Sequence, residues 1–105
     1  MPWIYLALAG LLEIVWALAM KQSHGFTRLG PTLLTLATMP ASFWLLSLSM
    51  RTLPLGTAYT IWTGIGAVGA FLAGVLWMGE PLNAMRLTAA ALLVSGLVMM
   101  KLSAA

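Results

Sequence analysis

Four long apolar runs account for most of this chain and limit what it can fold into. The runs cover residues 3–20, 29–50, 54–78 and 82–100, and short polar loops separate them. Each run is close to or above the roughly 20 residues that a helix needs to cross a bilayer. The sequence therefore predicts an all-α membrane protein in which residues 1–105 form a single domain of four transmembrane helices.

The composition excludes a soluble domain. Of the 105 residues, 62 % are hydrophobic and 7 % are charged, whereas soluble domains have about 25 % charged residues. The five Lys and Arg residues lie in or beside the loops, where they act as membrane anchors and form no patch for nucleic acid. The chain has no cysteine, so thiolate metal chemistry is excluded, and we expect no metal site, no cofactor and no enzymatic activity.

The charges of the loops show almost no preference for one side of the membrane. With four spans, Arg51 and Lys101 share one side, and Lys21, Arg28 and Arg86 share the other. The orientation of a membrane protein follows such counts, so this near balance predicts that the chain inserts in both directions. Two oppositely inserted copies would form an antiparallel homodimer.

Glu13 is a carboxylate in the middle of the first apolar run. An ionised carboxylate in hydrocarbon costs a few kcal/mol or more, so such groups face a bundle interior or a water-filled path. A buried ion pair is the structural alternative, but every cation of the chain lies near a membrane edge. We therefore expect a cationic substrate or a proton as the partner. Because burial disfavours the charged form, a proton and a cation compete for one carboxylate, which is a minimal antiport mechanism.

Aromatic side chains complete the expected site. Trp16 lies about one turn after Glu13, and Tyr59 and Trp62 share one face of the third run. They offer cation–π contacts and hydrogen-bond donors. The alternative for a membrane Trp or Tyr is the interfacial belt, which suits Trp3, Trp44 and Trp77.

Three other polar residues have structural interpretations. A serine in a span usually bonds its own backbone four residues back, but Ser42 lies beside the bend expected at Pro40 and can reach a neighbouring helix instead. Glu80, in the third loop, is expected to be solvated. Lys101 is expected to extend its ammonium group to the membrane surface.

Small residues indicate where helices approach one another. Gly10 shares a helix face with the carboxylate, and it serves either close packing or a substrate cavity. Gly64 and Gly66 fit either a packing seam or a hinge. Ala89 and Gly96 are seven positions apart on one stripe of the fourth run, which carries no charge between residues 87 and 100, and this favours a helix that packs in the assembly.

The motifs, in their order, make the chain similar to a known family. They are Glu13, GFTR at 25–28, ASFW at 41–44 and AYTIWTGIG at 58–66. With its length and four spans, the chain resembles the small multidrug resistance family over nearly its whole length. The resemblance implies an antiparallel homodimer with dual topology that exchanges protons for cations at paired membrane glutamates.

Two positions make the chain similar to the guanidinium-exporting subtype of that family. Trp16 stands where multidrug members generally have a small residue, and Met39 where they often have Tyr. The chemistry agrees, because guanidinium is planar, its paired N–H donors match a carboxylate, and aromatic planes stack on it. Quaternary ammonium has no such donors. Small hydrophobic substituents of a substrate could extend between helices toward lipid past Met39 and Phe43.

The resemblance also implies roles for individual residues. Glu13 binds substrate and proton, Trp16 lines the site, and the residues that hydrogen-bond and position the glutamate are Ser42, Tyr59 and Trp62. Gly10 lets the helices approach, and Gly64 to Gly66 resembles the kink about which the third helix differs between protomers.

We therefore expect a proton-coupled antiporter in the cell (inner) membrane that exports guanidinium and small substituted guanidinium cations. Within transport, the alternative is a multidrug efflux pump for quaternary ammonium and other lipophilic cations. An alternative of another class is a non-transporting structural subunit of a membrane complex, in which Glu13 bonds a partner helix.

Overall fold

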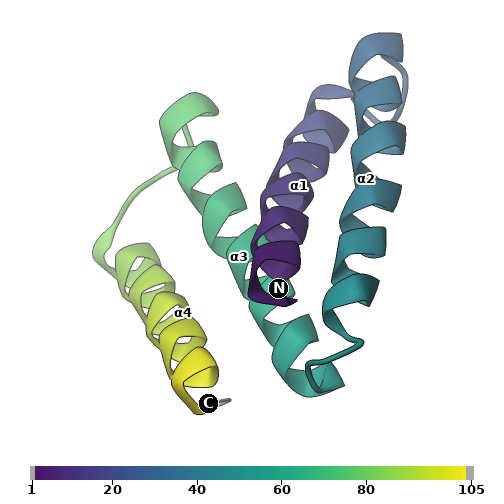
Figure 1. Ribbon diagram of the computed structural model, residues 1–105. Helices are drawn as coiled ribbons and strands as arrows, with labels where there is room; N and C mark the ends of the chain where they lie inside the picture. Colours follow the sequence, from purple (N-terminus) through teal and green to yellow (C-terminus); the bar gives the residue numbers. More distant parts are fainter. Residues whose placement is uncertain (1, 104–105) are drawn as a thin grey trace.

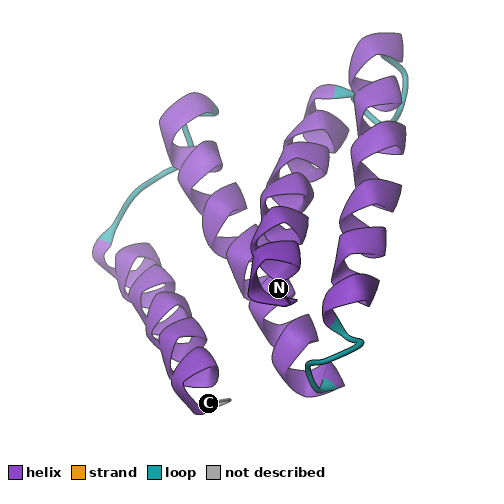
Figure 2. Ribbon diagram, in the orientation of Figure 1, coloured by secondary structure: helices purple, strands orange, loops and turns teal. Residues whose placement is uncertain are grey.

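The computed structural model describes residues 2–103, which form four helices joined by short loops (Figures 1 and 2). The helices are α1 (Pro2–Gln22), α2 (Leu29–Ser49), α3 (Leu55–Trp77) and α4 (Ala84–Ser103). All four are long and apolar enough to cross a membrane. The expected all-α fold with four membrane-spanning helices is therefore confirmed.

Some helices begin or end at other residues than the apolar runs do, because local side chains determine where a helix starts and stops. α1 continues through Lys21 to Gln22, and α4 continues past Lys101, because Lys and Gln are good helix formers and polarity alone does not end a helix. α4 begins later than its apolar run. The side chain of Asn83 accepts a hydrogen bond from the backbone N–H of Arg86 at 2.9 Å, which is the arrangement of an N-terminal cap.

The loop between α1 and α2 is a tight left-handed turn. His24, Gly25 and Phe26 have φ angles of 49°, 73° and 68°. Ser23 holds this turn, because its hydroxyl donates to the Met20 carbonyl at 2.6 Å and accepts from the Phe26 N–H at 3.0 Å. The turn lets α2 return beside α1 (Figure 1).

α1, α2 and α3 pack together, and α4 stands to one side (Figure 1). α1 packs against α2 and α3, whereas α4 packs against α3. The Cα trace measures 42 × 35 × 16 Å, so the chain forms a flat layer and not a closed bundle. No residue of α4 is buried, and most of its surface is free to contact lipid or protein.

A small apolar core fixes the first three helices. Its buried members are Leu6, Ala9, Leu46, Ala58, Ile61 and Trp62. Trp62 is the largest of them and is 7 % exposed. Because an aromatic side chain buries a large apolar area, this residue contributes strongly to the position of α3 against α1 and α2.

Candidate functional site

Glu13 packs directly against Gly66 of α3. The carboxyl group occupies the space in which a Cβ atom at position 66 would lie, so glycine is the residue that leaves room for it. The Oε1 atom of Glu13 is buried and has no hydrogen-bond partner within residues 2–103. Burial of a carboxylate oxygen without a hydrogen-bond partner raises the free energy of the folded chain. A bound cation would supply the missing partner, as expected for a group that binds an ion.

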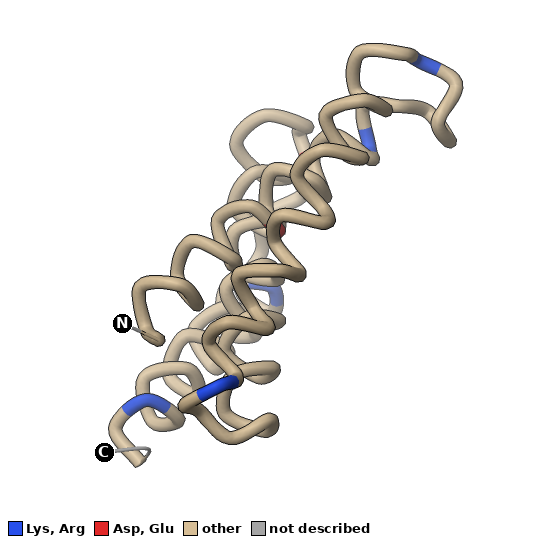
Figure 3. Tube along the Cα trace, turned by 45° about the vertical axis from the view of Figure 1, so that its right-hand side comes forward, with Lys and Arg blue, Asp and Glu red and all other residues tan. Residues whose placement is uncertain are grey.

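Glu13 forms no ion pair with any cation of residues 2–103. The one ion pair in that part of the chain joins Arg86 to Glu80 at 3.1 Å. The Lys101 ammonium lies 5.0 Å from the centre of the Trp3 ring. Figure 3 shows how few charged residues the trace carries. The carboxylate in the first span is therefore without a cationic partner from the described part of its own chain.

Glu80 is exposed, as expected of a solvated loop residue, but it also makes contacts that the sequence did not indicate. Besides its ion pair with Arg86, its backbone N–H donates to the Gly74 carbonyl at 3.1 Å, and its carboxylate contacts Gly74. The Arg86 guanidinium also lies 5.1 Å from the centre of the Phe71 ring. The third loop thus folds back over the end of α3. These contacts form because α4 runs back beside α3, and no pattern within a single helix predicts that arrangement.

A hydroxyl group joins three helices one turn from the carboxylate. The Trp62 indole N–H donates to the Ser42 hydroxyl at 3.0 Å, and this hydroxyl donates to the Ala9 carbonyl at 2.7 Å. Ser42 therefore reaches a neighbouring helix and does not bond its own backbone. The bonds from Ser42 and Trp62 to Glu13 that the resemblance implies stay a prediction.

Four aromatic rings form a continuous row beside this link. The ring of Phe43 lies 6.2 Å from that of Trp16 and 5.7 Å from that of Trp62, and Tyr59 lies 5.6 Å from Trp62. Within residues 2–103 the Trp16 indole nitrogen is buried without a partner, whereas Tyr59 is 53 % exposed. The bond from Tyr59 to the glutamate also stays a prediction.

Phe43 is the member of this row whose contacts the sequence did not indicate. The sequence predicted that Phe43 lies with Met39 on the path by which substituents of a substrate extend between helices toward lipid. In the structure Phe43 is 45 % exposed and Met39 is partly buried. Phe43 also bridges Trp16 and Trp62, which come from two other helices. A contact between residues on different helices leaves no periodic signal, although the neighbouring Ser42 and Trp44 mark the segment as unusual.

Glycines bring the helices close around the site. A Cβ atom at Gly10 would lie 2.6 Å from the Ile65 side chain, and one at Gly64 would overlap Leu97 of α4. Each close approach therefore needs the small residue at that position. α3 is a continuous helix through Gly64 and Gly66, and the kink implied by the resemblance stays a prediction.

The two small residues singled out on α4 are exposed. Ala89 and Gly96 both lie at the surface, and no atom lies within 4 Å of the position of a Cβ at Gly96. Their packing in an assembly is therefore not tested by the single chain. In residues 2–103 no group of three or more His, Cys, Asp or Glu side chains is arranged to hold a metal ion.

These observations define a class of protein: a multi-pass membrane protein of four helices with a carboxylate oxygen among its spans that is buried and has no partner within residues 2–103. Residues 1–93 match the family described as Small Multidrug Resistance protein. The chain belongs to the small multidrug resistance family, which confirms the resemblance carried by its motifs.

Several relatives are similar over nearly their whole length. The chain is 54 % identical over 103 residues to the guanidinium exporter of Citrobacter freundii, with 98 % of each chain covered. It is 54 % identical over 104 residues to the guanidinium exporter of Salmonella typhimurium strain LT2, with 99 % of each covered. The guanidinium exporter of Escherichia coli strain K12 is 52 % identical over 103 residues, with 98 % of each covered.

Proposed function

We propose that this protein is an antiporter, and not an enzyme, that exports guanidinium and small substituted guanidinium cations across the cell (inner) membrane in exchange for protons. The observation that carries the proposal is the Glu13 carboxylate, which packs on Gly66 with one oxygen buried and unpaired within residues 2–103. The names of the relatives at 52–54 % identity support the same substrate class.

Exchange follows from the shared use of one group. A protonated Glu13 has no charge with which to hold a cation, and an ionised Glu13 that holds a cation has no site for a proton. A proton that binds from the side of higher proton concentration therefore displaces the bound cation to that side. The carboxyl group then releases this proton on the opposite side, and the ionised carboxylate binds another cation there. This exchange of a proton for a cation involves no covalent step, cofactor or metal.

The surroundings of the carboxylate favour a flat cation with N–H donors. Two guanidinium N–H groups match the two oxygens of a carboxylate, and the guanidinium plane stacks on aromatic faces. The ring row from Trp16 through Phe43 to Trp62 supplies such faces next to the site. Substituents on the cation would leave the site past Met39 and the half-exposed Phe43, toward lipid.

The proposed functional unit is an antiparallel homodimer with dual topology, in which each chain contributes one four-helix domain and one Glu13. The balance of loop charges supports insertion in both directions. The lack of any buried residue in α4 supports its use as an assembly helix, with the exposed Ala89 and Gly96 at the contact. A kink at Gly64 and Gly66 would let the two copies of α3 differ.

Transport in proteoliposomes tests the proposal. Vesicles with an imposed pH gradient are expected to take up guanidinium with a matching proton flux, and to take up tetramethylammonium far more slowly. Rapid exchange of tetramethylammonium would support a multidrug pump instead, and no proton flux with either cation would support a structural subunit.

The variant Glu13→Gln isolates the carboxylate. It keeps the side-chain shape but removes the titrating charge, so proton-coupled uptake is expected to disappear while the protein stays folded. Glu80→Gln is the matched control, because Glu80 is the other carboxylate of the chain and pairs with Arg86 in a loop. Retained coupled uptake by Glu13→Gln would falsify the proposal.

A further inference from the structure

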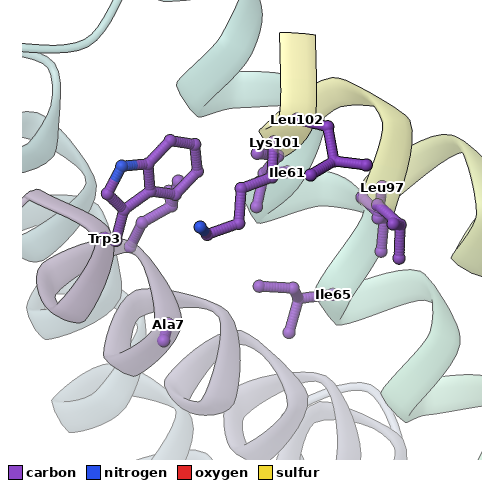
Figure 4. Close-up of a pocket in the computed structure, with 9 residues that line it drawn as sticks. Trp3, Ala7, Ile61, Ile65, Leu97, Lys101 and Leu102 are labelled. Carbon is purple, nitrogen blue, oxygen red and sulfur yellow. The ribbon is translucent and has the colours of Figure 1, made fainter. Parts of the chain in front are cut away.

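An apolar groove lies between α1, α3 and α4 on one face of the molecule. It has a volume of about 330 Å³. Trp3 of α1, Ile61 and Ile65 of α3, and Leu97 and Lys101 of α4 are among the residues that line it (Figure 4). The groove lies outside the Glu13 site, and the proposed transport cycle does not use it.

The groove runs from one end of the helices to about the middle of the bilayer. Trp3 lies in the first turn of α1 and Lys101 in the last turn of α4, so both mark the membrane edge. Ile65 follows Leu55, the first residue of α3, by ten positions, which is about 15 Å along a helix. Half of a hydrocarbon core of about 30 Å is the same length, so the groove has the depth of a single leaflet.

The outer end of the groove carries a positive charge that has no ion-pair partner within residues 2–103. Lys101 is the charged residue among those that line it, and its ammonium lies beside the Trp3 ring at the mouth (Figure 4). Within residues 2–103 neither carboxylate side chain pairs with Lys101, because Glu13 packs on Gly66 and Glu80 pairs with Arg86. An ammonium group beside an indole at the membrane edge is suited to a negatively charged group of an amphiphile.

A second groove between α3 and α4 differs in its chemistry. It has a volume of about 450 Å³ and is lined by residues such as Tyr59, Thr63 and Gly96, with no charged side chain among them. The first groove therefore differs from the second in that its apolar lining ends at a cation at the membrane edge.

We propose that the first groove binds an acidic phospholipid of the surrounding leaflet. One acyl chain lies along Ile61, Ile65 and Leu97, and the headgroup phosphate accepts a charge-assisted hydrogen bond from Lys101. Basic pockets between transmembrane helices bind anionic headgroups in this way. The inference depends on the membrane location of the chain and not on the proposed transport function.

Native mass spectrometry of the purified protein tests the headgroup. We expect phosphatidylglycerol to be retained in preference to phosphatidylcholine, and Lys101→Gln to weaken its retention about fivefold, as for the loss of one basic residue near a membrane surface. Lys21→Gln is the matched control, because Lys21 lies in the last turn of α1 and does not line the groove. Equal retention of the two lipids, or equal effects of the two variants, would overturn the proposal.

A second measurement tests the acyl chain. Phosphatidylglycerol with brominated acyl chains is expected to quench the fluorescence of Trp3, and Trp3→Phe should remove that part of the quenching. Ala7→Phe fills the groove, which Ala7 lines, and should reduce the quenching although Lys101 is intact. Glycerol phosphate should not displace the lipid. Displacement by glycerol phosphate, or unchanged quenching in Ala7→Phe, would show that the groove does not hold a lipid chain.

Discussion

The Ser42 hydroxyl on α2 donates a hydrogen bond of 2.7 Å to the carbonyl oxygen of Ala9 on α1. In an α-helix this carbonyl is also the acceptor for the backbone N–H four residues later, which belongs to Glu13. The same hydroxyl accepts a hydrogen bond from Trp62 on α3. A single small side chain therefore links the backbone that carries the carboxylate to both neighbouring helices.

Replacement of Ser42 by alanine should loosen this link. Ser42→Ala leaves the Trp62 N–H without its acceptor, and we expect a loss of about 0.6–1.7 kcal/mol in the free energy of unfolding, the range for hydrogen bonds between membrane helices. Guanidinium binding should also weaken. Unfolding in mixed micelles and isothermal titration measure the two effects.

Ser47→Ala is the control for Ser42→Ala. The exposed Ser47 bonds the Trp44 carbonyl of its own helix at 2.9 Å, so its loss should change little. Equal destabilisation by the two variants would contradict a special role for Ser42.

Gly66→Ala places a methyl group where the Glu13 carboxyl lies. The carboxyl or α3 must shift, and we expect a cost of about 1–3 kcal/mol, as for an overpacked core, together with loss of guanidinium uptake. Gly56→Ala lies in the same helix with no atom within 4 Å, so it should be neutral or stabilising by up to about 1 kcal/mol. A stable and active Gly66→Ala protein would refute this account of the contact.

Much of this architecture could be predicted from the sequence, because the relevant signals are local. Apolar runs of membrane-spanning length predicted all four helices, and the isolated charge of Glu13 singled out the carboxylate whose Oε1 atom is buried without a partner within residues 2–103. Trp62 was singled out by its spacing on one helix face with Tyr59, and Gly66 was singled out as part of a packing seam or hinge. Both Trp62 and Gly66 are buried in the structure.

Contacts between helices could not be predicted in the same way. The spacing of Ser42 does not specify Ala9 as its acceptor, and that of Phe43 does not place it between two indoles. Glu80 has the composition of a solvated loop residue, yet the return of α4 brings Arg86 to it. Each of these contacts depends on the relative positions of helices, which periodicity within one helix does not encode.

Trp16→Gly should relax selectivity. Removal of this indole opens the ring row at Phe43 and takes away one stacking face, so we expect guanidinium affinity to fall about two- to fivefold, the equivalent of one exposed cation–π contact. Uptake of bulkier quaternary ammonium ions should rise. Competition assays with both cations measure the change.

Trp44→Gly provides the control for Trp16→Gly, because Trp44 is 63 % exposed and the same loss of helix propensity applies. Its substrate range should not change. If both variants alter selectivity alike, the effect belongs to helix stability and not to the ring row.

The Arg86–Glu80 pair should contribute little to stability, although it is well formed. Both side chains are partly exposed, at 35 % and 44 %, and exposed pairs contribute about 0.2–1 kcal/mol. A double-mutant cycle of Arg86→Gln and Glu80→Gln is expected to give a coupling energy in that range, which declines at high salt because ions screen the charges. A coupling energy well above this range, or one insensitive to salt, would indicate that the pair is desolvated in the assembled protein.

The variant Gly96→Leu distinguishes effects on the folding of a single chain from effects on dimer formation. No atom lies within 4 Å of a Cβ at this position, and leucine is a much better helix former than glycine, so the single chain should fold at least as well. A dimer contact through the stripe of Ala89 and Gly96 has no room for the larger side chain. Light scattering in detergent and cross-linking in the membrane should therefore show a shift from dimer to monomer.

Ala91→Leu is the control for Gly96→Leu, because Ala91 lies on a different side of the same helix, and it should leave the dimer intact. An unchanged dimer in Gly96→Leu would show that the chains assemble through another face.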